Sequence, residues 1–74
     1  MKDKPILIDV CEWYYKGCII QKQDHQELMR YLIFQDDAYH LTVGMSHTFS
    51  EAKKIAELNE VPKELQKYGI DSFL

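Results

Sequence analysis

The sequence predicts one α+β domain, in which a small antiparallel sheet of three or four strands is packed by one helix and followed by a second, short helix. Several segments before about residue 44 show the period-two alternation of strands. A capped segment with helical spacing begins near residue 49. A chain of 74 residues has room for one hydrophobic core, so residues 1–74 are interpreted as a single domain.

The first strand-like region covers residues 6–15 and continues over residues 18–22. Between them, Lys16-Gly17 has the residue types of a two-residue hairpin turn. The polar stretch 23–27 has no periodicity and is expected to form a loop. This first unit is therefore either a hairpin or a single strand with an irregular lead-in.

Residues 28–44 form the clearest predicted hairpin. Residues 28–35 alternate, Asp36-Asp37 has the composition of a turn, and residues 39–43 alternate again on the returning strand. Gly44 is expected to end that strand.

The main helix is predicted over about residues 49–59. Thr48 and Glu51 have the spacing of a capping box, in which the threonine side chain accepts from the backbone three residues on, and Ser50 is a competing cap. The apolar residues of this segment share one stripe at helical spacing, which predicts that the helix covers the sheet.

A short C-terminal helix is predicted over about residues 62–68. Pro62 stands at a position that suits the first residue of a helix, and Gly69 stands just past its expected end.

Composition limits the class of protein. A hydrophobic fraction of 46% argues against intrinsic disorder. No apolar run approaches the ~20 residues of a membrane span, so we expect a cytoplasmic protein without a membrane partner. Nine Lys and Arg against twelve Asp and Glu give a net charge of −3, which disfavours strong nucleic-acid binding.

The two cysteines are expected to stay reduced. A turn at Lys16-Gly17 sets Tyr15 opposite Cys18 and leaves Cys11 several residues away. Cys11 and Cys18 could join two histidines, His40 and His47, as metal ligands, but six residues separate the members of each pair and zinc sites space their ligands more closely. We therefore expect no metal and no cofactor.

An enzyme is not expected. Cys18, His40 and Asp9 could be assigned the roles of nucleophile, base and orienting carboxylate, yet the sequence has no nucleophile elbow, no glycine-rich phosphate loop and no HExxH helix. We predict no catalytic residues.

The densest aromatic cluster, Trp13, Tyr14 and Tyr15, is the predicted partner-binding site. Alternation along a strand turns at least one of these rings to the opposite face, and exposed Trp and Tyr are common anchors of protein interfaces. The alternative is that two rings belong to the core and the third covers the edge of the helix.

One stretch resembles a known family. Tyr31-Leu-Ile-Phe34, a polar turn, Tyr39-His-Leu-Thr-Val-Gly44 and then His47-Thr-Phe-Ser-Glu-Ala-Lys-Lys54 are similar to the strand, turn, strand and helix start of arm-type DNA-binding domains of tyrosine integrases. The resemblance covers residues 28–58. It implies a three-stranded sheet with one helix, in which the sheet inserts into the DNA major groove with basic and aromatic side chains. The sheet segment departs from that pattern because its single basic residue, Arg30, stands with two aspartates.

The preferred hypothesis is a small non-enzymatic interaction or regulatory protein, similar to accessory or phage-type inhibitor proteins, that binds another protein or a second copy of itself. A sheet this small cannot hide its edges, which invites strand addition or dimerisation. The alternative is a nucleic-acid-binding module of the arm type, using Lys16, Lys22, Arg30, Tyr31 and Tyr39.

Overall fold

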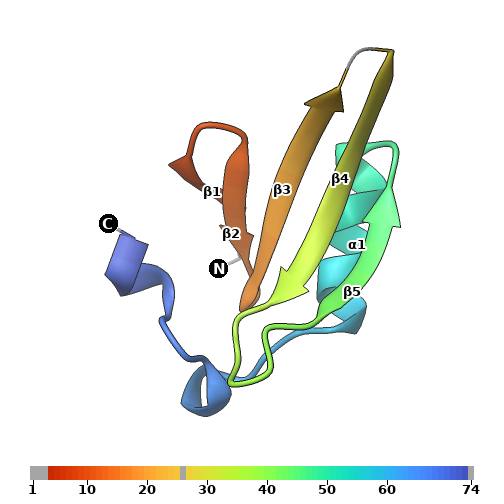
Figure 1. The fold of residues 1–74 in the computed structure, drawn as a ribbon. Helices are drawn as coiled ribbons and strands as arrows, with labels where there is room; N and C mark the ends of the chain where they lie inside the picture. The colour runs from red at the N-terminus through yellow and green to blue at the C-terminus, as the bar shows by residue number, and fades with distance from the viewer. Residues whose placement is uncertain (1–3, 26, 74) are drawn as a thin grey trace.

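The α+β class is confirmed, and the sheet has five strands instead of three or four. The computed structural model describes residues 4–25 and 27–73. The strands pair in sequence order as an antiparallel meander (Figure 1). They are β1 (Ile6–Asp9), β2 (Glu12–Tyr15), β3 (Cys18–His25), β4 (Leu28–Gln35) and β5 (Thr42–Ser46), and the helix α1 (Phe49–Leu58) follows.

The additional strand comes from a turn within the first strand-like region. Val10-Cys11 reverses the chain between β1 and β2, and Cys11 adopts a positive φ of 64°. The Asp9 carboxylate accepts a hydrogen bond from the Val10 backbone N–H at 2.7 Å, which stabilises the start of this turn. Because neither residue is a usual turn former, the sequence pattern did not reveal it.

The turn at Lys16-Gly17 is confirmed. Both residues have positive φ, 51° and 78°, as a type I′ hairpin turn requires, and Tyr15 pairs with Cys18. The predicted loop at 23–27 was wrong in its first half, because Gln23 to His25 belong to β3; Gln26 lies outside the described residues.

The hairpin of β4 and β5 is confirmed, but its connection is longer than predicted. Residues 36–41 separate the strands, and the Asp37 carboxylate accepts from the backbone N–H groups of Tyr39 and His40. Gly44 therefore lies inside β5 and does not end it. A Cβ at Gly44 would stand 2.7 Å from Ile55 Cγ2, so glycine permits the close approach of the helix.

The helix and its cap are confirmed. Thr48 Oγ1 accepts from the Glu51 backbone N–H at 3.2 Å. In a complete capping box the Glu51 carboxylate would accept from the Thr48 backbone N–H. Here it accepts from the Thr48 hydroxyl instead, at 3.1 Å.

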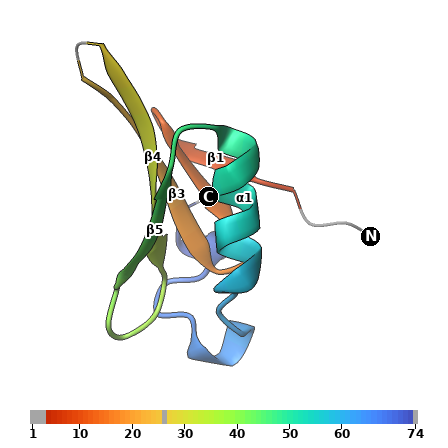
Figure 2. The same ribbon diagram turned by 90° about the vertical axis from the view of Figure 1, so that its right-hand side faces the viewer.

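The helix covers one face of the sheet, and the core lies between them (Figure 2). Ala52 and Ala56 are fully buried, which lets the helix backbone approach the strands, and Ile20 and Ile33 are fully buried beneath it. Burial of each isoleucine contributes roughly 1.5–3 kcal/mol. The buried cluster consists of Tyr15, Cys18, Ile20, Tyr31, Ile33, Ala52, Ala56 and Val61.

The predicted C-terminal helix over 62–68 was wrong. Two short 3-10 turns, η1 (Lys63–Leu65) and η2 (Ile70–Phe73), take its place. The backbone N–H groups of Lys67, Tyr68 and Gly69 donate to Asp36 instead of to a preceding turn of helix. The segment is therefore fastened to the sheet by tertiary contacts that a local pattern does not contain.

Within the described part of the chain, no helix has the length and apolar character needed to cross a membrane.

Candidate functional site

The face of the sheet opposite α1, here called the helix-free face, carries a connected row of polar side chains. The Gln21 amide donates to the Glu12 carboxylate at 2.8 Å, and the Gln23 amide donates to the Gln21 oxygen at 3.0 Å. Arg30 Nε completes the row by donating to the Gln23 oxygen at 2.9 Å. The row runs across β2, β3 and β4, because Glu12 pairs with Gln21 and Gln23 pairs with Arg30.

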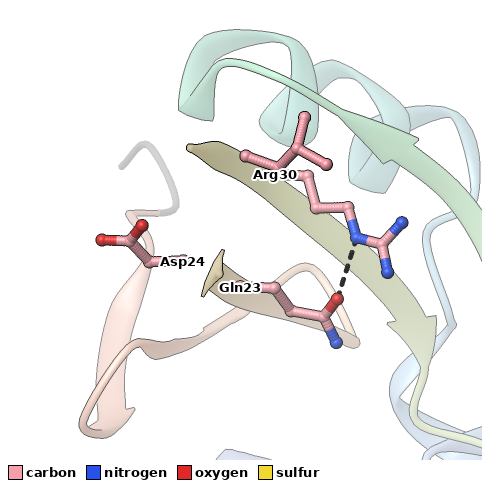
Figure 3. A pocket seen from close by; sticks show the side chains of 4 residues that line it. Gln23, Asp24 and Arg30 are labelled. Carbon is pink, nitrogen blue, oxygen red and sulfur yellow. Dashed lines mark hydrogen bonds between the residues drawn. The ribbon is translucent and has the colours of Figure 1, made fainter. Parts of the chain in front are cut away.

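Arg30 is the cation at the end of this row. Its Nη1 lies 3.8 Å from Met45 Sδ, so the guanidinium extends from β4 over β5. Figure 3 shows the bond between Arg30 and Gln23, with the Asp24 side chain pointing away from both. Together with Leu28 these residues line a shallow cavity of about 390 Å³ on the hairpin of β3 and β4, which projects past the end of α1 (Figures 1 and 2).

The strand β5 forms one margin of the sheet (Figure 1). Among the described residues, no strand pairs with its outer side, and its sequence, Thr-Val-Gly-Met-Ser, has neither a charge nor a proline. Met45 within β5 and Leu41 just before it remain 47% and 56% exposed. Edge strands usually carry charges or prolines that prevent pairing with another chain, and β5 lacks both.

The other margin, β1, is better protected. It has only four residues, Pro5 precedes it, Asp9 ends it, and its pairing with β2 is interrupted by a bulge between Leu7 and Asp9. Each of these features hinders the addition of a strand. The two edges are therefore unequal, and β5 is the more receptive one.

The predicted aromatic anchors lie mostly inside the molecule. Tyr15 is 5% exposed under the helix, and its hydroxyl donates to Glu57 at 2.7 Å. Half-buried Trp13 packs edge-on against Phe49, with ring centroids 4.9 Å apart. Tyr14 points to the opposite face, as alternation requires, but the C-terminal segment covers it and it is 4% exposed. The two tyrosines therefore present almost no surface to a partner.

The five residues of the nucleic-acid hypothesis do not share a surface. Arg30 lies on the helix-free face, whereas Lys22 pairs with Tyr31 on the helix side, where Tyr31 is buried. Lys16 lies in the turn between β2 and β3, and Tyr39 is 79% exposed in the loop before β5. The sheet brings one of these cations, and none of these rings, to the helix-free face.

The cysteines and histidines are dispersed. Cys11 is exposed and Cys18 buried, and both are free thiols in the structure. The Cys18 thiol points at the carbonyl oxygens of Ala56 and Asn59, at 3.8 and 3.3 Å. Burial, together with the nearby Glu60 carboxylate, raises the pKa of Cys18 to about 11, which keeps the thiol protonated and poorly nucleophilic at neutral pH.

His40 stacks on Phe34 at a centroid distance of 5.5 Å, on the helix-free face. In the described residues, no group of three or more His, Cys, Asp or Glu side chains is arranged to hold a metal ion.

Asp36 was predicted to lie in a turn, and its structural role was not expected from the sequence. Asp36 is fully buried, and its carboxylate accepts from the Tyr14 hydroxyl at 2.6 Å and from the backbone N–H groups of Tyr68 and Gly69. The pKa of Tyr14 is raised above its ordinary value, mainly because the hydroxyl is buried and in addition because it donates to the Asp36 carboxylate. The partners lie 22 to 33 positions away in the sequence, so no local signal could have identified them.

No protein-family model, curated protein or solved structure matches this chain.

Proposed function

We propose that this chain is a non-enzymatic interaction protein that binds a protein partner by accepting an extended segment of that partner against β5. The observation that carries the proposal is the contrast between the two sheet edges, because only β5 lacks charge and proline along its length. Along such an edge, half of the backbone N–H and C=O groups point outward and are ready to pair with a further strand.

Side chains beside β5 define the chemistry of the partner. Met45 and its cross-strand neighbour Leu32 offer an apolar strip on the helix-free face, and the Arg30 guanidinium lies next to Met45. An added segment therefore gains from an apolar residue against Met45 and from a carboxylate within reach of Arg30. Backbone pairing supplies affinity in this mode of recognition, and the alternate side chains supply specificity.

Nucleic acid is a poorer occupant of the same surface. Arg30 is the sole cation of the row formed by Glu12, Gln21, Gln23 and Arg30, and Glu12 offsets its charge. A protein that binds duplex DNA neutralises several phosphates with Lys and Arg. The helix-free face therefore suits a peptide with one or a few carboxylates better than a phosphate backbone.

The test is a selection of extended peptides from a random displayed library, followed by nuclear magnetic resonance titration of the isotope-labelled chain with the selected peptides. The proposal expects the largest amide shifts in β5. Met45→Lys introduces a charge of the kind that blocks natural edges and should abolish binding. Leu7→Lys is the matched control, since it adds the same charge at an exposed position of the other edge strand, β1, and should leave binding unchanged.

Two outcomes contradict the proposal. Selected peptides whose shifts map away from β5, or that bind both lysine variants equally, would exclude the edge as the site. Light scattering of the chain alone supplies the second check, because a doubled mass that Met45→Lys abolishes would show that a second copy, and not another protein, occupies β5.

A further inference from the structure

A second cavity lies at the other side of the molecule, between the N-terminal strands and the C-terminal segment. Its volume is about 630 Å³, within the ~300–1,000 Å³ typical of small-ligand pockets. Residues of β1, β2, the Lys16-Gly17 turn and the stretch 60–70 line it. It shares no lining residue with β5, so it is independent of the proposed protein-binding edge.

The walls of this cavity are mainly apolar. Ile6, Val61 and Ile70 line it together with the ring of Tyr14. Ile6 remains 40% exposed and Ile70 is only half-buried, so both present apolar surface to the cavity. A ligand with an apolar body would remove this surface from water, which is favourable in proportion to the area covered.

The rim of the same cavity is cationic. Among the described residues, Lys4, Lys16 and Lys63 line it together with one carboxylate, Glu60, so lysines outnumber carboxylates in this part of the lining even if Lys16 is set against Glu60. The whole chain, in contrast, carries −3, and these lysines are three of its nine Lys and Arg residues. This local excess of positive charge favours an anionic ligand, and flexible ammonium groups suit a carboxylate without demanding one rigid geometry.

The C-terminal wall is held in place before any ligand arrives. Val61 N–H donates to the Lys16 carbonyl at 3.1 Å, and the Gln66 amide donates to the Val61 carbonyl at 3.1 Å. Gly17 has a φ of +78° and passes so close to Val61 that an added Cβ would stand 2.6 Å from the Val61 oxygen. Farther along, Asp36 fastens the segment again. A preformed cavity avoids the entropic cost of ordering its walls on binding.

We propose that this cavity binds a small amphiphilic anion, a carboxylate with an aliphatic or aromatic body, with the body against Ile6, Val61 and Ile70 and the carboxylate at Lys4 and Lys63. The inference goes beyond the proposed protein-binding function and does not depend on it.

Titration of the isotope-labelled chain with octanoate, below the concentration at which it forms micelles, tests the proposal. The expected result is saturable amide shifts at Gly17, Val61 and Ile70. Octanol lacks the charge and inorganic phosphate lacks the apolar body, so both should bind more weakly than octanoate. Equal binding of octanol would overturn the role of the lysines, and equal binding of phosphate would overturn the role of the apolar wall.

Variants complete the test. Lys4→Gln combined with Lys63→Gln should weaken octanoate binding about three- to tenfold, as expected for the loss of two exposed ion pairs. Lys54→Gln, on the exposed side of α1, removes one lysine charge away from the cavity and should bind octanoate as the unmodified chain does. Unchanged affinity in the double variant, or no saturable shifts in the unmodified chain, would refute the proposal. Octanoate binding that survives Met45→Lys would confirm that the cavity and the β5 edge act separately.

Discussion

Replacing Tyr14 with phenylalanine tests whether the buried hydrogen bond to Asp36 holds the C-terminal segment on the sheet. The substitution removes one hydroxyl, whose bond to the Asp36 carboxylate is 2.6 Å long and fully enclosed. A hydrogen bond to a charged group contributes about 1.5–3 kcal/mol, and its loss leaves a buried acceptor with one partner fewer. We expect Tyr14→Phe to lower the free energy of unfolding by that amount.

The expected loss is large for a chain of this size. At roughly 0.05–0.15 kcal/mol per residue, 74 residues give a total stability of about 4–11 kcal/mol. A loss of 1 kcal/mol lowers Tm by about 4–8 °C in a domain of this length, so Tyr14→Phe should lower Tm by at least about 6 °C. Asp36→Ala should cost more, because it leaves the Tyr14 hydroxyl and the backbone N–H groups of Tyr68 and Gly69 without their acceptor.

Urea denaturation and thermal unfolding, each followed by circular dichroism, measure these losses. Tyr39→Phe is the matched control, since it removes the same atom from a ring that is 79% exposed and should change stability by less than about 0.5 kcal/mol. Hydrogen exchange adds a local reading, because the amides of Tyr68 and Gly69 should exchange faster in Tyr14→Phe. The reasoning is refuted if Tyr14→Phe costs no more than Tyr39→Phe, or if the two amides keep their protection.

Three further predictions follow from the same structure. The pKa of Cys18 is raised in the folded state to about 11 from an ordinary 9.0. The stability that Cys18 contributes is therefore complete below about pH 9 and is lost as the pH rises toward 11. Urea denaturation across this range should show the decline, and Cys18→Ala should remove the part that begins near pH 9. The raised pKa of Tyr14 acts in the same direction from its ordinary value of 10.0 upward, so it adds to the decline in the upper part of this range and beyond, and Cys18→Ala should leave that part unchanged. Gly44→Ala should destabilise the protein by about 1–3 kcal/mol, because its Cβ would lie 2.7 Å from Ile55 Cγ2. In a double-mutant cycle, Gly44→Ala and Ile55→Ala together should lower the free energy of unfolding by less than the sum of the two single changes, because Ile55→Ala removes the atom that the new Cβ would meet. A short DNA duplex at low salt should leave the elution volume of the chain unchanged in size-exclusion chromatography, whereas a shift that is lost on adding salt and on Arg30→Gln would restore the nucleic-acid hypothesis.

Local sequence signals predicted those parts of the fold whose cause is local. The turn at Lys16-Gly17 formed as expected, because a two-residue hairpin turn needs backbone with positive φ and glycine adopts it without strain. Thr48 capped α1 because its side chain meets an N–H only three residues away. Such signals lie within a few residues of each other and are therefore visible in the sequence alone.

The candidate sites could be predicted only in part. An exposed sheet edge was expected from the small size of the domain, but which edge is open depended on the strand order and on the additional turn at Val10-Cys11. The aromatic cluster at residues 13–15 was predicted to bind a partner because of its composition. Its exposure, however, depends on α1 and on Phe73, which lie far away in the sequence. The cavity lined by Lys4 and Lys63 is formed by residues 4–17 together with residues 60–70, so no local sequence pattern could predict it.

By itself, the sequence determined the class of the fold, the main helix and the hairpins whose turns have specific residue requirements, because backbone conformation and short-range hydrogen bonds depend on neighbouring residues. Tertiary structure decided the conformation of residues 62–73 and the burial of Tyr14, because Asp36 gathers donors from β2 and from the C-terminal segment into one enclosed site. The energy of that arrangement arises only when segments 22 to 33 residues apart meet away from water, where an unpaired carboxylate is costly and a paired one holds the chain in place.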